Sequence, residues 1–79
     1  MNGALATNTN ELRKLLIDCD IKTVKELSER TGVNRNTLSQ VLNGKIQPSS
    51  DVMVQLVWAL DIEPQKAGEI FFNRNLRDA

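Results

Sequence analysis

The sequence predicts an all-α fold, a compact bundle of five short helices in one domain. Apolar residues recur at spacings of three and four along most of the chain, which is the period of an amphipathic helix. Side chains able to cap a helix precede most of these segments. The 79 residues, 41% hydrophobic and 25% charged, have the composition of a small globular domain. No strand pattern competes convincingly.

The first helix is expected over about residues 9–19. Leu12 and Leu16 lie one turn apart on its apolar face. Asn8 is the expected N-cap, and Glu11 three positions later completes a capping-box pattern. In such a box each of the two side chains accepts a hydrogen bond from the backbone N–H of the other residue.

The second helix is expected over about residues 23–31. Thr23 and Glu26 form another capping-box pattern at its start. Gly32 suits the left-handed backbone conformation just past a helix end, which other residues adopt at a cost. The helix is therefore predicted to end at this glycine.

The third helix is expected over about residues 34–42, with Asn34 as its N-cap. A connection of only about three residues makes two short helices cross steeply, so the pair forms a helix-turn-helix. Small Ser28 lies where the two helices approach most closely. The apolar seam between them is supplied by Val33, Leu38 and Val41.

Two more helices complete the bundle. The fourth is expected over about residues 51–60, and the fifth begins at Pro64, because proline suits the first turn of a helix. We expect residues 1–8 to be a flexible N-terminal segment, residues 9–72 to be the helix-turn-helix domain, and residues 73–79 to be a C-terminal tail.

The residue inventory excludes several functions. There is no histidine and a single cysteine, Cys19, so metal sites and histidine-dependent hydrolytic triads lack their groups. Cys19 is expected to fill the core, and its lack of a disulfide partner suits the reducing cytoplasm. No segment is long enough to span a bilayer, and no secretory signal is evident. We expect no enzyme activity, no cofactor, no metal, no small-molecule ligand and no membrane contact.

The second and third helices carry a family resemblance. Residues 23–40 read TVKELSERTGVNRNTLSQ, and VLNGK follows to Lys45. This segment resembles the Cro/repressor-type (lambda-repressor-like) helix-turn-helix family of phage and bacterial regulators, and the similarity covers about residues 9–72. The resemblance implies a small transcriptional regulator, most like a phage Cro or repressor. Its third helix would enter the major groove of double-stranded DNA, and a homodimer would bind a near-palindromic operator.

The resemblance also implies which side chains read bases. The matching positions, near the start of the third helix and one turn on, are Arg35, Asn36 and Gln40. Their chemistry fits this role, because Arg can donate two hydrogen bonds to guanine and Asn or Gln can pair with adenine. The alternative is that these three residues are an inert solvated face.

DNA-backbone contacts are expected at both ends of the third helix. The candidates are Thr23, Asn34, Thr37, Ser39, Asn43 and Lys45. Thr23 would act together with the N–H groups at the start of the second helix, where the helix dipole favours an anion. Val24 departs from the family, in which many members carry a glutamine that supports phosphate and base contacts.

The charge is unevenly distributed although its total is zero. Residues 21–47 hold five basic and two acidic side chains, a net charge of +3, whereas residues 1–20 have −1 and residues 48–79 have −2. The positive charge therefore gathers on the proposed binding segment, as expected for a protein that is oriented by DNA.

Apolar side chains beside the inward stripe of the fourth helix suggest a second surface. Val54 and Trp58, with Phe71 or Phe72 from the last helix, are the possible dimer interface. Alternatively, the C-terminal segment covers Trp58 and completes a monomer. In a different functional class, this surface would bind another protein, as in an antitoxin or antirepressor of the same fold.

Overall fold

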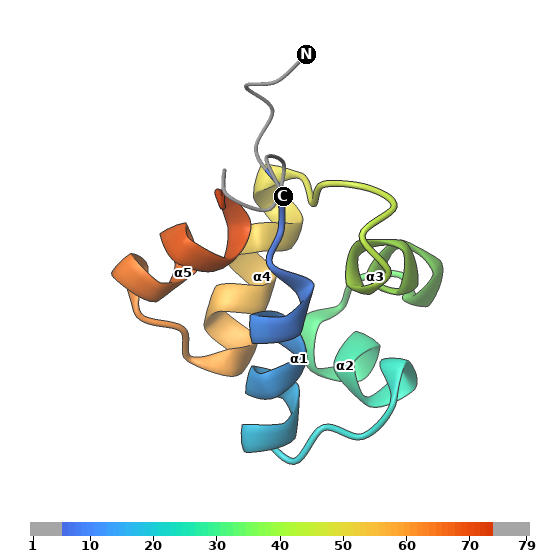
Figure 1. Cartoon of the computed structure of the whole chain (residues 1–79). Coiled ribbons are helices and arrows are strands. Elements are labelled where there is room, and N and C mark those ends of the chain that lie inside the picture. The colour runs from blue at the N-terminus through green and yellow to red at the C-terminus, as the bar shows by residue number, and fades with distance from the viewer. Residues whose placement is uncertain (1–5, 74–79) are drawn as a thin grey trace.

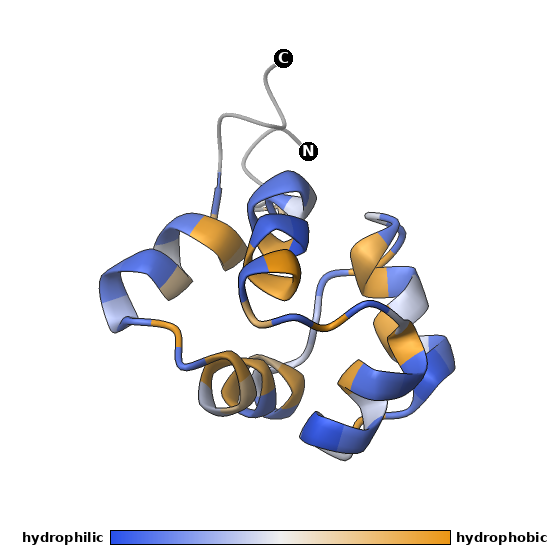
Figure 2. Cartoon of the chain, turned by 90° about the horizontal axis from the view of Figure 1, so that it is seen from below, coloured by the Kyte–Doolittle hydropathy of each residue, from blue (hydrophilic) through white to orange (hydrophobic). Residues whose placement is uncertain are grey.

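The computed structural model describes residues 6–73, which fold into five α-helices without a β-strand. The helices are α1 Thr9–Asp18, α2 Val24–Thr31, α3 Arg35–Leu42, α4 Ser50–Leu60 and α5 Pro64–Phe71. The predicted all-α class is confirmed, and every helix starts within one residue of its predicted start. α3 and α5 lie on opposite sides of the molecule, and α1 contacts both (Figure 1, Figure 2).

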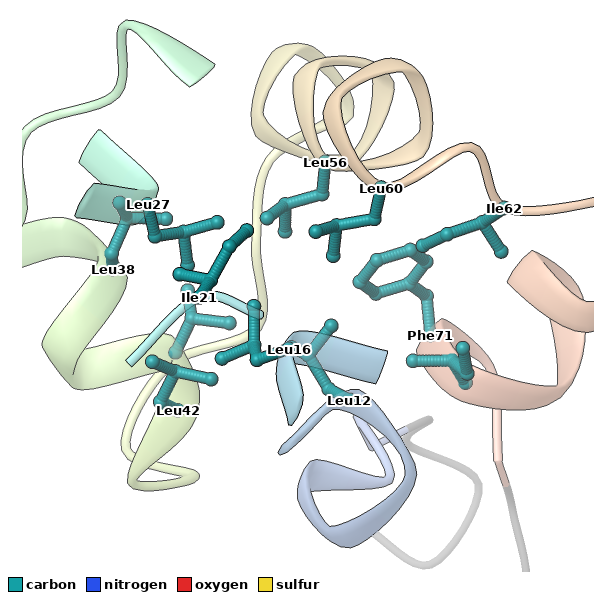
Figure 3. Close-up of a cluster of buried hydrophobic side chains, with 12 residues drawn as sticks. Leu12, Leu16, Ile21, Leu27, Leu38, Leu42, Leu56, Leu60, Ile62 and Phe71 are labelled. Carbon is teal, nitrogen blue, oxygen red and sulfur yellow. The ribbon is translucent and has the colours of Figure 1, made fainter. Parts of the chain in front are cut away.

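One hydrophobic core joins all five helices (Figure 3). Each helix contributes at least one side chain that is almost completely buried, among them Leu12, Leu27, Leu38, Leu56 and Phe71. Burial of a side chain of this size stabilises a fold by about 1.5–3 kcal/mol. The core therefore holds α2 and α3 against the rest of the bundle and fixes where their outer faces point.

The capping box predicted at α1 forms only in part. Asn8 Oδ1 accepts a hydrogen bond from the Glu11 N–H at 3.2 Å, as predicted. The predicted return bond is wrong, because the Asn8 N–H donates instead to the Ile70 carbonyl of α5 at 2.6 Å. The Glu11 carboxylate lies 2.9 Å from Lys66 Nζ and 3.2 Å from Lys14 Nζ. Tertiary packing has thus turned this carboxylate toward α5.

The same ion pairs shift two protonation equilibria. Hydrogen bonds from Lys66 and then Lys14 lower the pKa of Glu11 below its ordinary value. The hydrogen bond to Glu11 raises the pKa of Lys66 above its ordinary value. Both shifts favour the charged forms that join α1 to α5.

The ends of the described chain pack against each other. Ala6 and Asn73 form an isolated antiparallel bridge with N···O distances of 3.2 and 3.0 Å. Thr7 is buried, and its hydroxyl donates to Gln47 Oε1 at 2.8 Å. Ala6 and Thr7 belong to the N-terminal segment that was expected to be flexible, and Asn73 to the expected C-terminal tail, and all three form hydrogen bonds with distant parts of the chain. The rest of the predicted N-terminal segment and C-terminal tail lies outside residues 6–73.

The described residues include neither a helix that could span a membrane nor a cluster of side chains suited to a metal ion. Over residues 6–73 no helix combines the length and apolar character needed to cross a membrane. In the same part of the chain, no three or more His, Cys, Asp or Glu side chains gather where they could hold a metal ion. Cys19 is free and partly buried, with its Sγ 3.9 Å from the Leu60 carbonyl, so it packs against the core.

Candidate nucleic-acid interface

The turn between α2 and α3 depends on a left-handed residue. Gly32 has φ +75°, and its N–H donates to the Ser28 carbonyl at 2.8 Å. An added Cβ would meet nothing within 4 Å. Backbone conformation, and not lack of space, is therefore the reason that glycine suits this position.

Two hydroxyls fasten the same turn. Ser28 Oγ donates to the Val33 carbonyl at 2.6 Å. Thr31 Oγ1 donates to the Leu27 carbonyl at 2.8 Å and accepts from the Val33 N–H at 3.1 Å. Ser28 was expected only as a small residue at a close approach, and Thr31 was not singled out. Together they satisfy the backbone of Val33 and fix the angle at which α3 leaves the turn.

α3 presents a polar outer face on an apolar base. Asn34 Oδ1 accepts from the Asn36 N–H at 2.7 Å and the Thr37 N–H at 3.4 Å, so it is the N-cap that the sequence predicts. The inner face of the helix is buried. Its buried side chains are Leu38, Val41 and Leu42.

None of the three predicted base-reading residues is buried. Arg35 and Asn36 are exposed in the first turn, and Gln40 is half-buried one turn further on. Asn36 and Gln40 are separated by four positions, which stacks them along the helix axis. Asn36 and Gln40 therefore lie on the side of α3 away from its buried residues, and Arg35 is exposed at the start of the helix, on a different side from Gln40.

The predicted backbone-contacting residues flank this face. Thr23, Asn34, Asn43 and Lys45 are exposed, and Thr37 and Ser39 are half-buried. Each of them lies in α3, at one of its ends, or at the start of α2. Val24 is half-buried and packs against the core, so this position offers no polar group.

A carboxylate lies at the N-terminus of α2. Glu26 Oε1 accepts from the Lys22 N–H at 3.1 Å and lies 3.4 Å from the Thr23 hydroxyl, while Thr23 Oγ1 caps the Glu26 N–H at 3.1 Å. In the predicted capping box the Glu26 carboxylate would accept from the Thr23 N–H, but it accepts from the Lys22 N–H, one residue earlier. The first helical N–H groups, of Val24 and Lys25, have no intrahelical partner and are left for an outside acceptor.

Sequence reasoning missed one residue of this surface, Arg13 of α1. Its Nη2 donates to the Leu42 carbonyl at 2.9 Å and to Asn43 Oδ1 at 3.2 Å. No local pattern could have indicated this contact, because its partners lie 29 and 30 positions further along the chain.

Only some of the apolar side chains predicted for the possible dimer interface are exposed. Trp58 is 75% exposed, Phe72 49% and Val54 44%, so we call these three residues the apolar patch. Phe71 is only 1% exposed. Including Phe71 in the possible interface was wrong, because its ring is a central part of the core (Figure 3).

Two helices joined by a left-handed glycine turn, the second with an exposed polar face, form a helix-turn-helix. A family model, the Cro/C1-type HTH DNA-binding domain, matches residues 11–66. The chain belongs to this family, whose members are typically not enzymes. No curated protein and no solved structure gave a match.

Proposed function

We propose that this chain is a small transcriptional regulator that binds a specific sequence of double-stranded DNA. The observation that supports this best is α3 itself, where exposed Arg35 and Asn36 and half-buried Gln40 accompany a buried inner face. α3 enters the major groove and α2 lies across it. Arg35 donates to guanine O6 and N7, while Asn36 and Gln40 pair with adenine N6 and N7.

Backbone contacts on both sides of the groove set the register of α3. Thr23 and the N–H groups at the start of α2 bind one phosphate, which the helix dipole favours. Asn43 and Lys45 bind the backbone beyond the other end of α3. Side chains along α3 contribute as well. These are Asn34, Thr37 and Ser39.

The regulator acts as a two-fold dimer on a near-palindromic operator. One recognition helix makes too few base contacts for tight specific binding, whereas two of them about 34 Å apart read successive turns of one DNA face. The apolar patch supplies the surface for the second copy, because Trp58 is 75% exposed. A dimer bound to its operator in the cytoplasm of a bacterium, or of a phage-infected host, blocks polymerase where the operator overlaps the promoter, or helps it where the operator lies beside the promoter.

Selection of bound duplexes from a random pool tests base reading. The wild-type chain should enrich one motif with two-fold symmetry. Arg35→Ala and Gln40→Ala should each weaken binding to that motif by about 5- to 150-fold, since a good bidentate pair contributes about 1–3 kcal/mol. Gln55→Ala, which changes an exposed glutamine of α4, is the matched control and should bind normally. Unchanged sequence preference in both α3 variants would contradict the assignment.

Light scattering tests the dimer. The wild-type chain should have the mass of two copies at micromolar concentration, and Trp58→Ala should shift it toward one copy, with Gln55→Ala as the control. The apolar patch also favours a second candidate, a protein-binding module such as an antitoxin or antirepressor. That second function is favoured if the chain is monomeric and forms a stoichiometric complex with the product of a neighbouring gene. Trp58→Ala should then disrupt this complex.

A further inference from the structure

The contact between α1 and the end of α3 bears on the DNA interface. Arg13 Nη2 bridges the Leu42 carbonyl, at 2.9 Å, and Asn43 Oδ1, at 3.2 Å. Asn43 is exposed, so the bond to its side chain is not needed to satisfy a buried polar group, whereas the bond to Leu42 satisfies one of the last carbonyls of α3, which lack intrahelical partners. An exposed side chain with five N–H donors could instead remain in water. The bridge therefore orders two surface groups beside the face that we assign to DNA.

The chemistry of the two side chains determines how Asn43 is oriented. A guanidinium only donates hydrogen bonds, so the atom of Asn43 that faces it must be the amide oxygen. The NH2 group then lies on the other branch of the amide from the oxygen that faces Arg13. The backbone of Asn43 is also fixed, because its N–H donates to the Ser39 carbonyl at 3.0 Å.

This orientation is the one that a phosphate requires. Phosphate oxygens accept hydrogen bonds, so they attract the NH2 group of Asn43 and repel its oxygen. Without Arg13, rotation of the amide would present either group. Arg13 also places a positive charge beside the Leu42 carbonyl, at the negative end of the α3 dipole, where an approaching phosphate would otherwise be repelled.

We infer that Arg13 is a positioning residue of the DNA interface, which holds the Asn43 amide with its NH2 group toward a DNA phosphate. The inference rests on the proposed DNA binding and adds α1 to the surface that carries it. Arg13 acts through Asn43 and reads no base, so its loss changes affinity and leaves the preferred sequence unchanged.

A double-mutant cycle on the duplex selected by the wild-type chain tests the role. Asn43→Ala should weaken binding about 10-fold, the size expected for one hydrogen bond to a charged group. Arg13→Gln should cause a similar loss, and the double variant should be little weaker than either single variant. Lys14→Gln removes the same charge from the next residue of α1 and is the matched control. Thermal melting of every variant shows whether binding was measured on folded protein.

A second readout needs no DNA. The order parameter of the Asn43 side-chain NH2 group, measured by ¹⁵N relaxation in the free protein, should fall in Arg13→Gln and stay unchanged in Lys14→Gln. An unchanged order parameter in Arg13→Gln would overturn the positioning role whatever the DNA affinity.

The outcomes separate this inference from the proposed function. If the wild-type chain enriches no duplex, both are contradicted. If it binds a specific duplex and Arg13→Gln behaves like Lys14→Gln, only the inference fails. The inference also fails if the losses of DNA affinity in Arg13→Gln and Asn43→Ala are additive and the slope of the logarithm of the binding constant against the logarithm of the salt concentration becomes shallower by about 0.9 in Arg13→Gln alone. Arg13 would then contact a phosphate independently of Asn43.

Discussion

The two sides of this small bundle differ in the chemistry of their surfaces. On the α2–α3 side, hydroxyls and a left-handed glycine fix the turn, and the outer face is polar within a segment of net charge +3. On the α4–α5 side the outer face carries exposed Trp58 and Phe72, in a segment of net charge −2. One side suits a polyanion and the other an apolar protein surface. A bundle of fewer than 80 residues can therefore present two surfaces of different chemistry around a single core.

The largest expected effect is a difference in the free energy of unfolding between two phenylalanine substitutions at the end of α5, one in the core and one on the surface. Phe71 is 1% exposed and Phe72 49%, although they are adjacent in the chain. Phe71→Ala should lower the free energy of unfolding by about 3–5 kcal/mol, because it leaves a cavity in the core. Phe72→Ala should cost under 1 kcal/mol in the monomer, since surface changes are usually within about 0.5 kcal/mol. Urea denaturation at low protein concentration measures both losses, and equal losses would contradict the assignment of Phe71 to the core and of Phe72 to the surface.

A pair of glycine substitutions compares the turn with the apolar side. Gly32→Ala forces a side chain into a left-handed conformation and should lower the free energy of unfolding by about 1–2 kcal/mol. Gly68→Ala lies inside α5, where an added Cβ meets nothing within 4 Å, and should raise it by about 0.5–1 kcal/mol. Thermal denaturation followed by circular dichroism measures the two shifts. Shifts of the same sign would show that the conformation of Gly32 does not control the turn.

The smallest expected effect is a dependence on pH at the junction of α1 and α5. The pKa of Glu11 is lowered by Lys66 and Lys14, so its contribution to stability is complete above the ordinary value of 4.5 and is lost as the pH falls through the lower value of the folded state. The raised pKa of Lys66 contributes below its ordinary value of 10.5, and this contribution is lost as the pH rises through the folded-state value.

Glu11→Gln should therefore flatten both ends of the stability profile slightly. Solvent screens these exposed groups, so the effect is small. Glu63→Gln, which removes an exposed carboxylate at the start of α5, is the matched control in a series of melting curves from pH 3 to 11. A profile for Glu11→Gln identical to that of the wild type would show that the ion pairs do not contribute.

Local sequence determined most of the fold and the outline of the site. The spacing of Leu38, Val41 and Leu42 already implies which face of α3 is buried, and therefore that Asn36 and Gln40 face away from it. Arg35 lies three positions before Leu38, so its exposure comes from its place at the start of the helix. Caps and turns depend on neighbours within about four residues, so Asn34 and Gly32 could be assigned from the sequence. Family resemblance then connected this outer face with DNA, and the family match supports that connection.

Only the tertiary structure decided the contacts that join distant segments. Glu11 pairs with Lys66, which is 55 positions away, and Arg13 reaches Asn43 across 30 positions. Likewise, the periodicity of α5 indicated that one phenylalanine must be exposed, and packing against the core selected Phe72. Helix periodicity and capping act over a single turn and can be read from neighbouring residues. A contact between distant residues depends on how whole helices are placed relative to one another, which no local pattern in the sequence records.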